Sequence, residues 1–479
     1  MAEELKPDLC VIGAGAAGLA VAAAAATLGV PVVLIEKGRM GGEHLNTGCV
    51  PSKAMVAAGR RADVFRTIGP FGVKIGRPAV EFDEVNDHVH RVINSLAPNA
   101  SRERLTGMHV RVIDGEARFR DTRTVIVGQD DDIKFEIRAR RFVIATGSRP
   151  AMPPISGIEQ CPYFTSENIF DARERPKHLI VIGAGPTGLE LAQAFRRLGS
   201  EVTVLEQAPQ PLANEDPECA AIVLDALARE GITIRSGVKV ERVRALRQRV
   251  EVVLAGDTEE SIQGTDLLIA TGRQPNIAGL DLDEARVKHE ASGIKVNKRF
   301  GTSNRRVYAI GDVTGLPQFT HVATHQAGLL IKHLLFRLPI ALNVDEIPRV
   351  TFTEPELAHV GLTDGQAREV HGAIRVLRWP YQDNDRAQAE RETRGHIKVV
   401  TDAKGLILGV TIVGAAASEQ ISTWTLAINH QLNIRAMAEL VVPYPTYIEV
   451  GKRAAISFFT PKLSTSWVRR LSSVLRRFG

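Results

Sequence analysis

The chain contains the same glycine-rich pattern twice, and this repeat limits the folds open to it. The segment "LCVIGAGAAGLAVAAAAATLGVPVVLIEK" begins at Leu9, and "LIVIGAGPTGLELAQAFRRLGSEVTVLEQ" begins at Leu179; the two align without a gap. Each reads as an apolar strand, a G-x-G-x-x-G turn, a helix and a second strand that ends in glutamate. Two such units predict an α/β fold with two Rossmann-like dinucleotide-binding domains. The matched residues are Gly13, Gly15, Gly18 and Glu36 in the first segment and Gly183, Gly185, Gly188 and Glu206 in the second.

The glycines and the glutamate are the residue types that dinucleotide binding needs at this spacing. Glycine allows a tight turn and lets a pyrophosphate approach the backbone at a helix N-terminus. The glutamate that ends the second strand is placed to hydrogen-bond ribose hydroxyls. One glycine-rich turn is weak evidence, because such turns also serve packing alone. Two complete units with matching acidic ends predict two bound dinucleotides, which implies two cofactors that exchange electrons.

Three further phrases are expected beside these turns. "FVIATGSRP" contains Thr146 and Gly147, and "LLIATGRQP" contains the equivalent Gly272. Both read as a buried strand that ends in a turn near the nucleotide. In "VYAIGDVTG", Asp312 follows a strand, where its carboxylate can bind the hydroxyls of a polyol or sugar.

Composition limits the class of protein. A chain of 479 residues is too long for one core and suggests about three domains. The net charge is +5, with no basic run outside the last residues, so we expect no nucleic-acid partner. The four cysteines show neither a disulfide framework nor metal-finger spacing. This pattern predicts a reducing compartment and no metal site.

A long uncharged stretch near the N-terminus imitates a membrane segment. No charged side chain occurs from Leu9 to Ile35. Glycines and Pro31 divide the stretch into strand, turn, helix, turn and strand, and the preceding "MAEELKPD" lacks the positive start of a signal peptide. We therefore expect a buried βαβ unit in a cytoplasmic protein.

With these motifs the chain resembles the pyridine nucleotide-disulfide oxidoreductases, the class I flavoproteins that include dihydrolipoamide dehydrogenase, glutathione reductase and mercuric reductase. The likeness extends to about Pro461. It implies that the first unit binds FAD, that the second binds NAD(P)H, and that the enzyme is a homodimer with a shared site. The residues expected to contact FAD are Gly13, Gly15, Gly18, Glu36, Lys53, Thr146, Gly147 and Asp312. Those expected to contact the nicotinamide cofactor are Gly183, Gly185, Gly188, Glu206 and Gly272.

The resemblance also implies a domain order. Beyond about Ile347, phrases such as "PRVTFTEPELAHVGLTDGQA" read as antiparallel strands and "EQISTWTLAINHQL" as a helix, as in an α+β interface domain. The expected parts are an FAD-binding domain at 1–155, an NAD-binding domain at 156–275, the second part of the FAD-binding and central region at 276–346, the interface (dimerisation) domain at 347–463, and a basic amphipathic tail at 464–479.

The residues at and after Glu206 bear on the choice between NADH and NADPH. A carboxylate accepts a hydrogen bond from the ribose 2′-hydroxyl and repels a 2′-phosphate. The following "QAPQPLANED" offers no arginine or lysine to hold that phosphate. The sequence therefore predicts NADH as the reductant, with NADPH less favoured.

The stretch "GGEHLNTGCVPSK" predicts the chemical centre. The residues after Cys49 read as a helix with Pro51 in its first turn, so the thiol would lie at a helix N-terminus, which stabilises a thiolate. An inert buried cysteine is the alternative. The family's disulfide enzymes read G-G-x-C-x-x-x-x-C-x-P-x-K here, so Cys49 resembles the flavin-proximal thiol. His44 stands where the interchange thiol is expected. No other cysteine has a plausible sequence position to replace it, although a thiol brought close by the fold stays open.

The phrase "VVPYPTYIEVG" resembles the family pattern H-P-T-x-x-E, whose histidine serves the interchange thiol across the dimer. Here Tyr444 replaces that histidine and Glu449 is retained. Tyrosine, with an ordinary pKa near 10, is a poor base at neutral pH. Mercuric reductases also have tyrosine at this position. Because the thiol and its base are both missing, we do not expect thiol–disulfide exchange.

Two charged residues resemble the family's hydride-accepting site. Lys53 lies one helical turn after Cys49, and Glu190 lies on the helix after the second glycine turn. The family pairs the equivalent residues beside the flavin, on the nicotinamide side, although a solvated glutamate is the plain alternative. A metal held by His44 and Cys49 is the weaker interpretation of those two residues. The paired cysteines found near the C-terminus of mercuric reductases are absent here.

The last residues, "STSWVRRLSSVLRRFG", predict a basic amphipathic helix. Such a helix lies on anionic membranes, or else docks on its own dimer, and the sequence leaves both open. Its apolar residues are Trp467, Val468, Leu471, Val474, Leu475 and Phe478, and its basic ones are Arg469, Arg470, Arg476 and Arg477.

Together these features predict an NADH-dependent FAD oxidoreductase. Electrons would leave on the Cys49 side to an acceptor that is not a simple disulfide, such as a quinone, a metal ion or a protein partner. One alternative is a mercuric reductase- or dihydrolipoamide dehydrogenase-type enzyme with a substitute thiol. Another is a flavin-loaded subunit with little turnover. It would recruit partners through its tail, or bind the inner face of a membrane through it.

Overall fold

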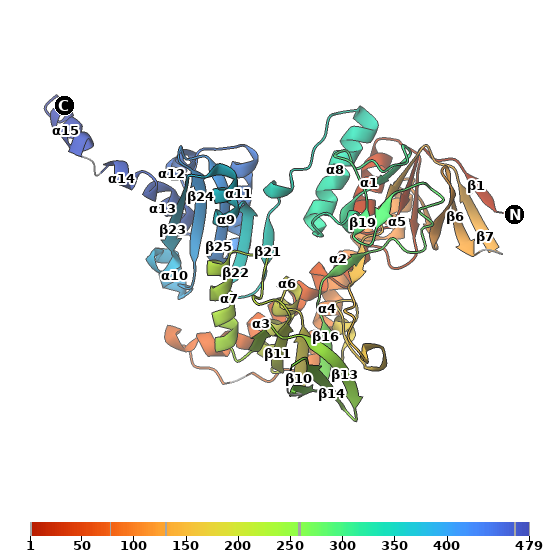
Figure 1. Cartoon of the computed structure of the whole chain (residues 1–479), viewed down its shortest axis with the longest axis horizontal. Coiled ribbons are helices and arrows are strands. Elements are labelled where there is room, and N and C mark those ends of the chain that lie inside the picture. The colour runs from red at the N-terminus through yellow and green to blue at the C-terminus, as the bar shows by residue number, and fades with distance from the viewer. Residues whose placement is uncertain (1, 77, 130–131, 257–259, 464–465, 479) are drawn as a thin grey trace. The chain divides into compact units, whose positions relative to one another are not determined.

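The computed structural model describes the whole chain except residues 1, 77, 130–131, 257–259, 464–465 and 479. The predicted tail therefore includes three residues, Ser464, Thr465 and Gly479, that lie outside the described part. Two units are distinguished, and each is described by itself (Figure 1). The first unit comprises Met1–Gly183, Ala194–Leu205 and Val238–Leu342, and the second comprises Ala184–Gln193, Glu206–Gly237 and Asn343–Gly479.

A five-stranded parallel sheet forms the centre of the first unit. Leu9 and Val11 point to one face, where they pack with helices α1 (Ala16–Thr27) and α8 (Thr320–Phe336), whereas Cys10 and Ile12 point to the other face. Both faces are covered, so every position of the central strand is apolar. The predicted buried βαβ unit is thus confirmed. In spatial order the strands are β20 (Val307–Ala309), β8 (Arg141–Ile144), β2 (Leu9–Ile12), β3 (Val32–Glu36) and β4 (Arg111–Asp114).

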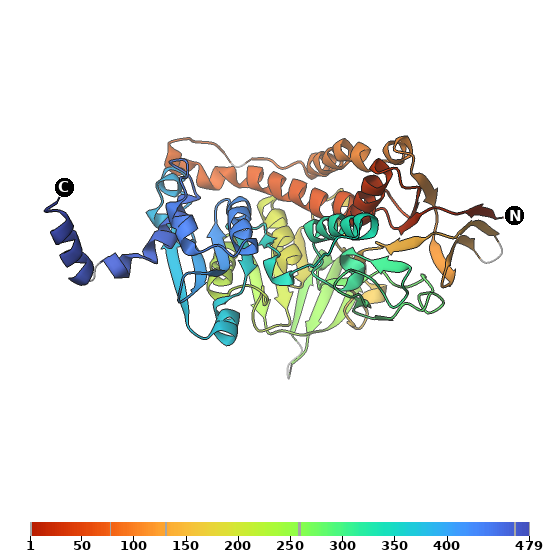
Figure 2. The same ribbon diagram turned by 90° about the horizontal axis from the view of Figure 1, so that it is seen from above.

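Helices cover one face of this sheet and a second sheet covers the other. Helices α1 (Ala16–Thr27) and α8 (Thr320–Phe336) lie side by side in both views (Figures 1 and 2). The long orange-red helix of Figure 2 is α3 (Cys49–Thr67). The remaining helices here are α2 (Gly42–Asn46), α4 (Phe82–Leu96) and α5 (Arg102–Gly107). The covering sheet has the order β1 (Glu3–Leu5), β7 (Asp132–Ile137), β6 (Thr124–Gln129) and β5 (Ala117–Asp121).

The second glycine-rich segment repeats the arrangement of the first. Strand β10 pairs in parallel with β11 on one side and with β16 on the other, as β2 pairs with β3 and β8. Their bounds are β10 (His178–Ile182), α6 (Pro186–Arg197), β11 (Glu201–Glu206) and β16 (Asp266–Ile269). Smaller elements are β12 (Thr233–Ser236), β13 (Val240–Leu246), β14 (Arg249–Leu254), β15 (Glu260–Gly264), the antiparallel pair β9 (Ser148–Pro150) and β17 (Arg273–Pro275), and the pair β18 (His289–Glu290) and β19 (Gly293–Ile294).

The second unit contains the predicted antiparallel α+β domain. Its strands have the order β21 (Arg349–Thr351), β22 (Glu356–Gly361), β25 (Ile407–Gly414), β24 (His396–Asp402) and β23 (Ile374–Pro380). Buried Trp424, on the predicted helix α11 (Ala417–Asn429), packs into the core of this sheet. The other helices are α7 (Pro217–Arg229), α9 (Asp364–His371), α10 (Asp385–Glu390), α12 (Ile434–Glu439), α13 (Glu449–Ser457), α14 (Thr460–Leu463) and α15 (Ser466–Leu475).

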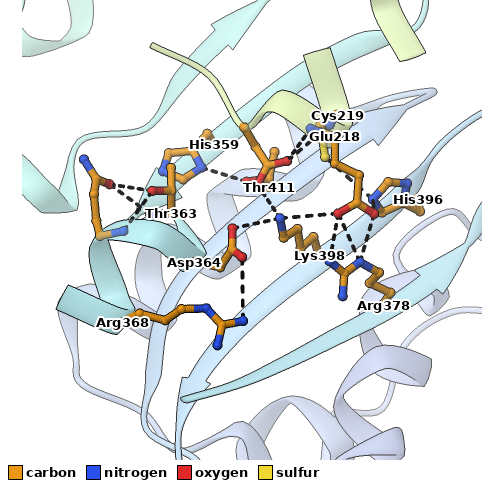
Figure 3. A network of polar contacts seen from close by, with 12 residues as sticks. Glu218, Cys219, His359, Thr363, Asp364, Arg368, Arg378, His396, Lys398 and Thr411 are labelled. Carbon is orange, nitrogen blue, oxygen red and sulfur yellow. Dashed lines mark hydrogen bonds and ion pairs between the residues drawn. The ribbon is translucent and has the colours of Figure 1, made fainter. Parts of the chain in front are cut away.

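One buried lysine joins helices α7 and α9 to strand β24. The Lys398 ammonium donates to Asp216 Oδ2 at 2.6 Å and to Asp364 Oδ1 at 2.9 Å, and it lies 3.4 Å from Glu218 Oε2 (Figure 3). Asp216 also accepts from the backbone N–H groups of Glu218 and Cys219, so it caps α7 as well as pairing with the lysine. A single cation thus holds two helix N-termini against the sheet.

We predict that Lys398→Met destabilises the second unit by about 3–5 kcal/mol, because Asp216 would be left buried without its counter-charge. Chemical denaturation followed by circular dichroism measures this loss. Lys404→Met is the matched control, since Lys404 is exposed in the turn between β24 and β25. Equal stability of the two variants would contradict the assigned role of Lys398.

Candidate cofactor and thiol site

Both glycine turns have the same backbone requirement. Gly13 has φ of +102° and Gly183 has φ of +108°, a region that L side chains rarely adopt. A Cβ atom at either position would also overlap a carbonyl oxygen, that of Ala145 or that of Ala270. Each turn therefore lies directly against the A-T-G phrase that follows its sheet, as the sequence predicted.

Both acidic strand ends are held in the same way. The Glu36 carboxylate accepts from the N–H of Ala14 at 2.6 Å and from that of Gly38 at 2.8 Å. The Glu206 carboxylate accepts from the N–H of Ala184 at 2.7 Å and from that of Ala208 at 2.8 Å. Two backbone donors thus orient each carboxylate next to its glycine turn, where a ribose would lie.

The first unit has the room and the unsatisfied polar atoms that FAD would need. No atom lies within 4 Å of a Cβ placed on Gly147, so open space borders this turn. Nδ1 of His44 and Nε2 of Gln326 are buried and have no hydrogen-bond partner among the described residues. Buried polar atoms are normally paired, so a bound group in this region can supply the missing partners. The residues present therefore fit a dinucleotide.

Three polar side chains from distant segments form a network with Asp312, a residue predicted to bind FAD. Ser148 Oγ donates to Asp312 Oδ2 at 2.6 Å. Arg273 donates to Ser148 Oγ at 2.7 Å and to Glu43 Oε1 at 3.3 Å, and its Nε lies 3.8 Å from Asp312 Oδ2. The guanidinium therefore balances two carboxylates and fixes the orientation of Asp312 through Ser148.

Glu43 carries an unusual charge environment next to His44. Burial raises the pKa of Glu43 above its usual range, while Arg273 and Lys53 oppose that rise and Asp312 adds to it. Burial lowers the pKa of His44, so its imidazole is neutral at physiological pH. His44 is thus a neutral group next to Glu43, a carboxyl group whose pKa is raised.

Cys49 lies where two helices begin. It is the first residue of α3, as predicted, with Pro51 in the first turn. Its Sγ lies 3.3 Å from Oγ1 of Thr320, the first residue of α8. Helix N-termini attract negative charge, so two positive dipole ends lie beside this sulfur.

The four thiols differ sharply in access to solvent. Cys49 is exposed, whereas Cys10, Cys161 and Cys219 are buried. Burial raises the pKa of each of these three thiols, which disfavours their reactive thiolate forms. Cys49 is thus the one thiol of the four that is exposed to solvent in this structure.

Glu190 and Lys53 fall in separate units. Glu190 is buried on α6, and its Oε1 accepts from the backbone N–H of Phe352 at 2.9 Å. Lys53 is half-buried on α3, close enough to Glu43 to affect that residue's pKa. The pair that the resemblance implies beside the flavin stays a prediction.

Tyr444 is oriented by a residue that sequence reasoning missed. It is exposed, and its hydroxyl donates to Asp385 Oδ2 at 2.6 Å. This hydrogen bond raises the pKa of Tyr444 above its ordinary value, which makes it a still poorer base at neutral pH. Glu449, half-buried at the start of α13, adds only a smaller repulsion.

Comparison with known proteins shows the family of this chain. Residues 7–327 match the pyridine nucleotide-disulphide oxidoreductase family, and residues 347–455 match its dimerisation domain. The chain belongs to this family. It is therefore an FAD-dependent NAD(P)H oxidoreductase, and its dimerisation domain implies a homodimer.

Individual relatives agree with this assignment. A mercuric reductase of Lysinibacillus sphaericus is 36% identical over 455 residues, which cover 94% of this chain and 82% of that protein. A dihydrolipoyl dehydrogenase of Thermus scotoductus is 35% identical over 460 residues, which cover 94% of this chain and 96% of that protein. Among solved structures, the Cu(II) complex of the HOCl-induced flavoprotein disulfide reductase RclA from Escherichia coli has a TM-score of 0.85 at 29% identity and covers 94% of this chain and 99% of that one.

We predict that Arg273→Met weakens FAD retention of the holoenzyme by about tenfold or more, because Glu43 and Asp312 lose their shared counter-charge. The ratio of bound flavin to protein after gel filtration measures the loss. Arg149→Met, on the paired strand but exposed, is the control and should retain its flavin. Equal flavin content in both variants would contradict this role.

Proposed function

We propose that this oxidoreductase passes electrons from NADH through FAD and the single thiol Cys49 to an acceptor other than a simple disulfide. FAD, when bound, accepts a hydride from the nicotinamide and can pass on both electrons. A quinone acceptor would take up these two electrons and two protons to become a hydroquinone. The residues of this chain would bind and orient the cofactors and hold the thiol at the exit side.

The inventory of thiols is the observation that carries this proposal. His44 occupies the position of the interchange cysteine, and the other three cysteines are buried. In a homodimer the partner subunit has the same buried thiols, so it offers no replacement either. The alternative, a mercuric reductase- or dihydrolipoamide dehydrogenase-type enzyme with a substitute thiol, would need one of these buried cysteines to become accessible.

The residue at the position of the family's base supports the same view. A disulfide exchange needs a base that takes a proton from the attacking thiol near neutral pH. Tyr444 stays protonated, because its hydroxyl donates to Asp385.

NADH is proposed as the reductant rather than NADPH. The Glu206 carboxylate is fixed by two backbone donors and cannot turn away from a 2′-phosphate without losing both bonds. We expect Glu206→Gln to lower the ratio of kcat/KM for NADH to kcat/KM for NADPH. A clear preference of the unmodified enzyme for NADPH would contradict the proposal.

The proposed acceptor class is tested with a panel of oxidants. With NADH and the holoenzyme, kcat/KM for a naphthoquinone should exceed that for lipoamide, glutathione disulfide and an aromatic disulfide by at least about tenfold. Cu(II) and Hg(II) belong in the panel, because solved and curated relatives are a Cu(II) complex and mercuric reductases. Faster turnover with a disulfide than with every other oxidant would overturn the proposal.

Paired variants separate the thiol's role from general damage. Cys49→Ala should lower turnover with the preferred acceptor while leaving the rate of flavin reduction by NADH unchanged. Cys161→Ala, which removes a buried thiol elsewhere, is the control and should leave both rates unchanged. Rapid flavin reduction by NADH would also exclude the alternative of a binding subunit with little turnover.

A further inference from the structure

A helix with an uncovered apolar side lies beyond the part of the chain that matches the family. The family's dimerisation domain ends at residue 455, whereas α15 spans Ser466–Leu475 and its last turn extends to Phe478. Backbone bonds from Arg476 N–H to Ser472 O and from Phe478 N–H to Leu475 O carry this turn. We call Trp467–Phe478 the tail helix.

The apolar side chains of the tail helix are solvent-exposed. Trp467 is 68% exposed and Phe478 is 84% exposed, one at each end, and Leu475 between them is 60% exposed. Every residue from Trp467 to Phe478 is exposed except Val468, which is half-buried. Large apolar side chains gathered in this way mark a surface that binds something apolar.

The helix separates apolar from basic residues. At 3.6 residues per turn, the apolar side chains share a stripe about 120° wide and the arginines occupy the opposite side. The stripe consists of Trp467, Val468, Leu471, Val474, Leu475 and Phe478, and the basic side of Arg469, Arg470, Arg476 and Arg477.

The net positive charge of the chain lies in the segment that contains the tail helix. Five of its 60 basic residues lie between Pro461 and Gly479, and this segment has no acidic residue. The 55 basic residues elsewhere equal the 55 acidic ones, so the net charge of +5 belongs entirely to this segment. A second copy of the chain has no excess of acidic residues to attract this segment, whereas an anionic lipid surface carries the opposite charge.

We propose that the tail helix binds the surface of an anionic lipid bilayer. Its apolar stripe would enter the boundary between headgroups and acyl chains, and its arginines would contact lipid phosphates. At ten residues α15 is about 15 Å long, so it lies along the surface instead of crossing it. Among the described residues, no helix is long and apolar enough to cross a membrane.

Vesicle co-sedimentation of the full-length holoenzyme tests the proposal. Phosphatidylcholine vesicles that contain phosphatidylglycerol should bind the enzyme at least about tenfold more strongly than phosphatidylcholine alone, and added salt should weaken this binding. No preference for the anionic vesicles would overturn the proposal. So would unchanged binding after removal of the chain beyond Thr460.

A matched pair of variants identifies the side of the helix that binds. Leu471→Glu and Ser473→Glu add the same charge to the same helix, but on the apolar and the basic side respectively. Ser473→Glu should weaken vesicle binding by about fivefold through its charge alone. Leu471→Glu should weaken it by about fiftyfold or more, because it also removes a leucine side chain that would enter the bilayer. Equal losses would overturn the proposal.

Two controls complete the test. Flavin reduction by NADH should be the same in both variants and the unmodified enzyme, because the tail helix lies outside the cofactor site. This readout also separates failure of lipid binding from failure of the proposed electron transfer. If Leu471→Glu instead changed the oligomeric mass in light scattering and the unmodified enzyme ignored vesicles, docking on a second copy would replace the lipid proposal.

Discussion

The structure depends on one backbone constraint that occurs twice. A buried parallel strand ends in a glycine with positive φ, and the carboxylate of the next strand holds the following N–H group. A side chain at Gly13 or Gly183 would overlap a carbonyl oxygen, so only glycine fits at these positions. Each dinucleotide is therefore expected beside one of these two turns.

The proposed chemical centre differs from the family pattern at two residues, His44 and Tyr444. Cys49 lies between the beginnings of α3 and α8, where helix dipoles favour negative charge. The neighbouring position is occupied by neutral His44, and Tyr444 is held in its protonated form by Asp385. In the family resemblance, the missing thiol and the missing base belong to the same half-reaction. The proposed function therefore assigns no disulfide exchange to this site and treats Cys49 as a solitary thiol.

The sequence predicted those parts that depend on neighbours in the chain. The two βαβ units, the start of α3 at Cys49, the antiparallel sheet and the tail helix follow from glycine spacing, helix periodicity and strand alternation. It did not predict the contacts of Arg273 with Glu43 and Ser148, or that of Asp385 with Tyr444. These side chains are ordinary surface types in sequence and meet only after distant strands and helices have packed. The Lys398 cluster was missed for the same reason.

The central claim is that a single thiol, and no redox disulfide, lies beside the flavin. Anaerobic titration of the holoenzyme with NADH, followed by the visible absorbance of the flavin, tests it most directly. The account predicts complete reduction after two electrons per subunit. Uptake of four electrons per subunit would reveal a second redox pair and would contradict the account.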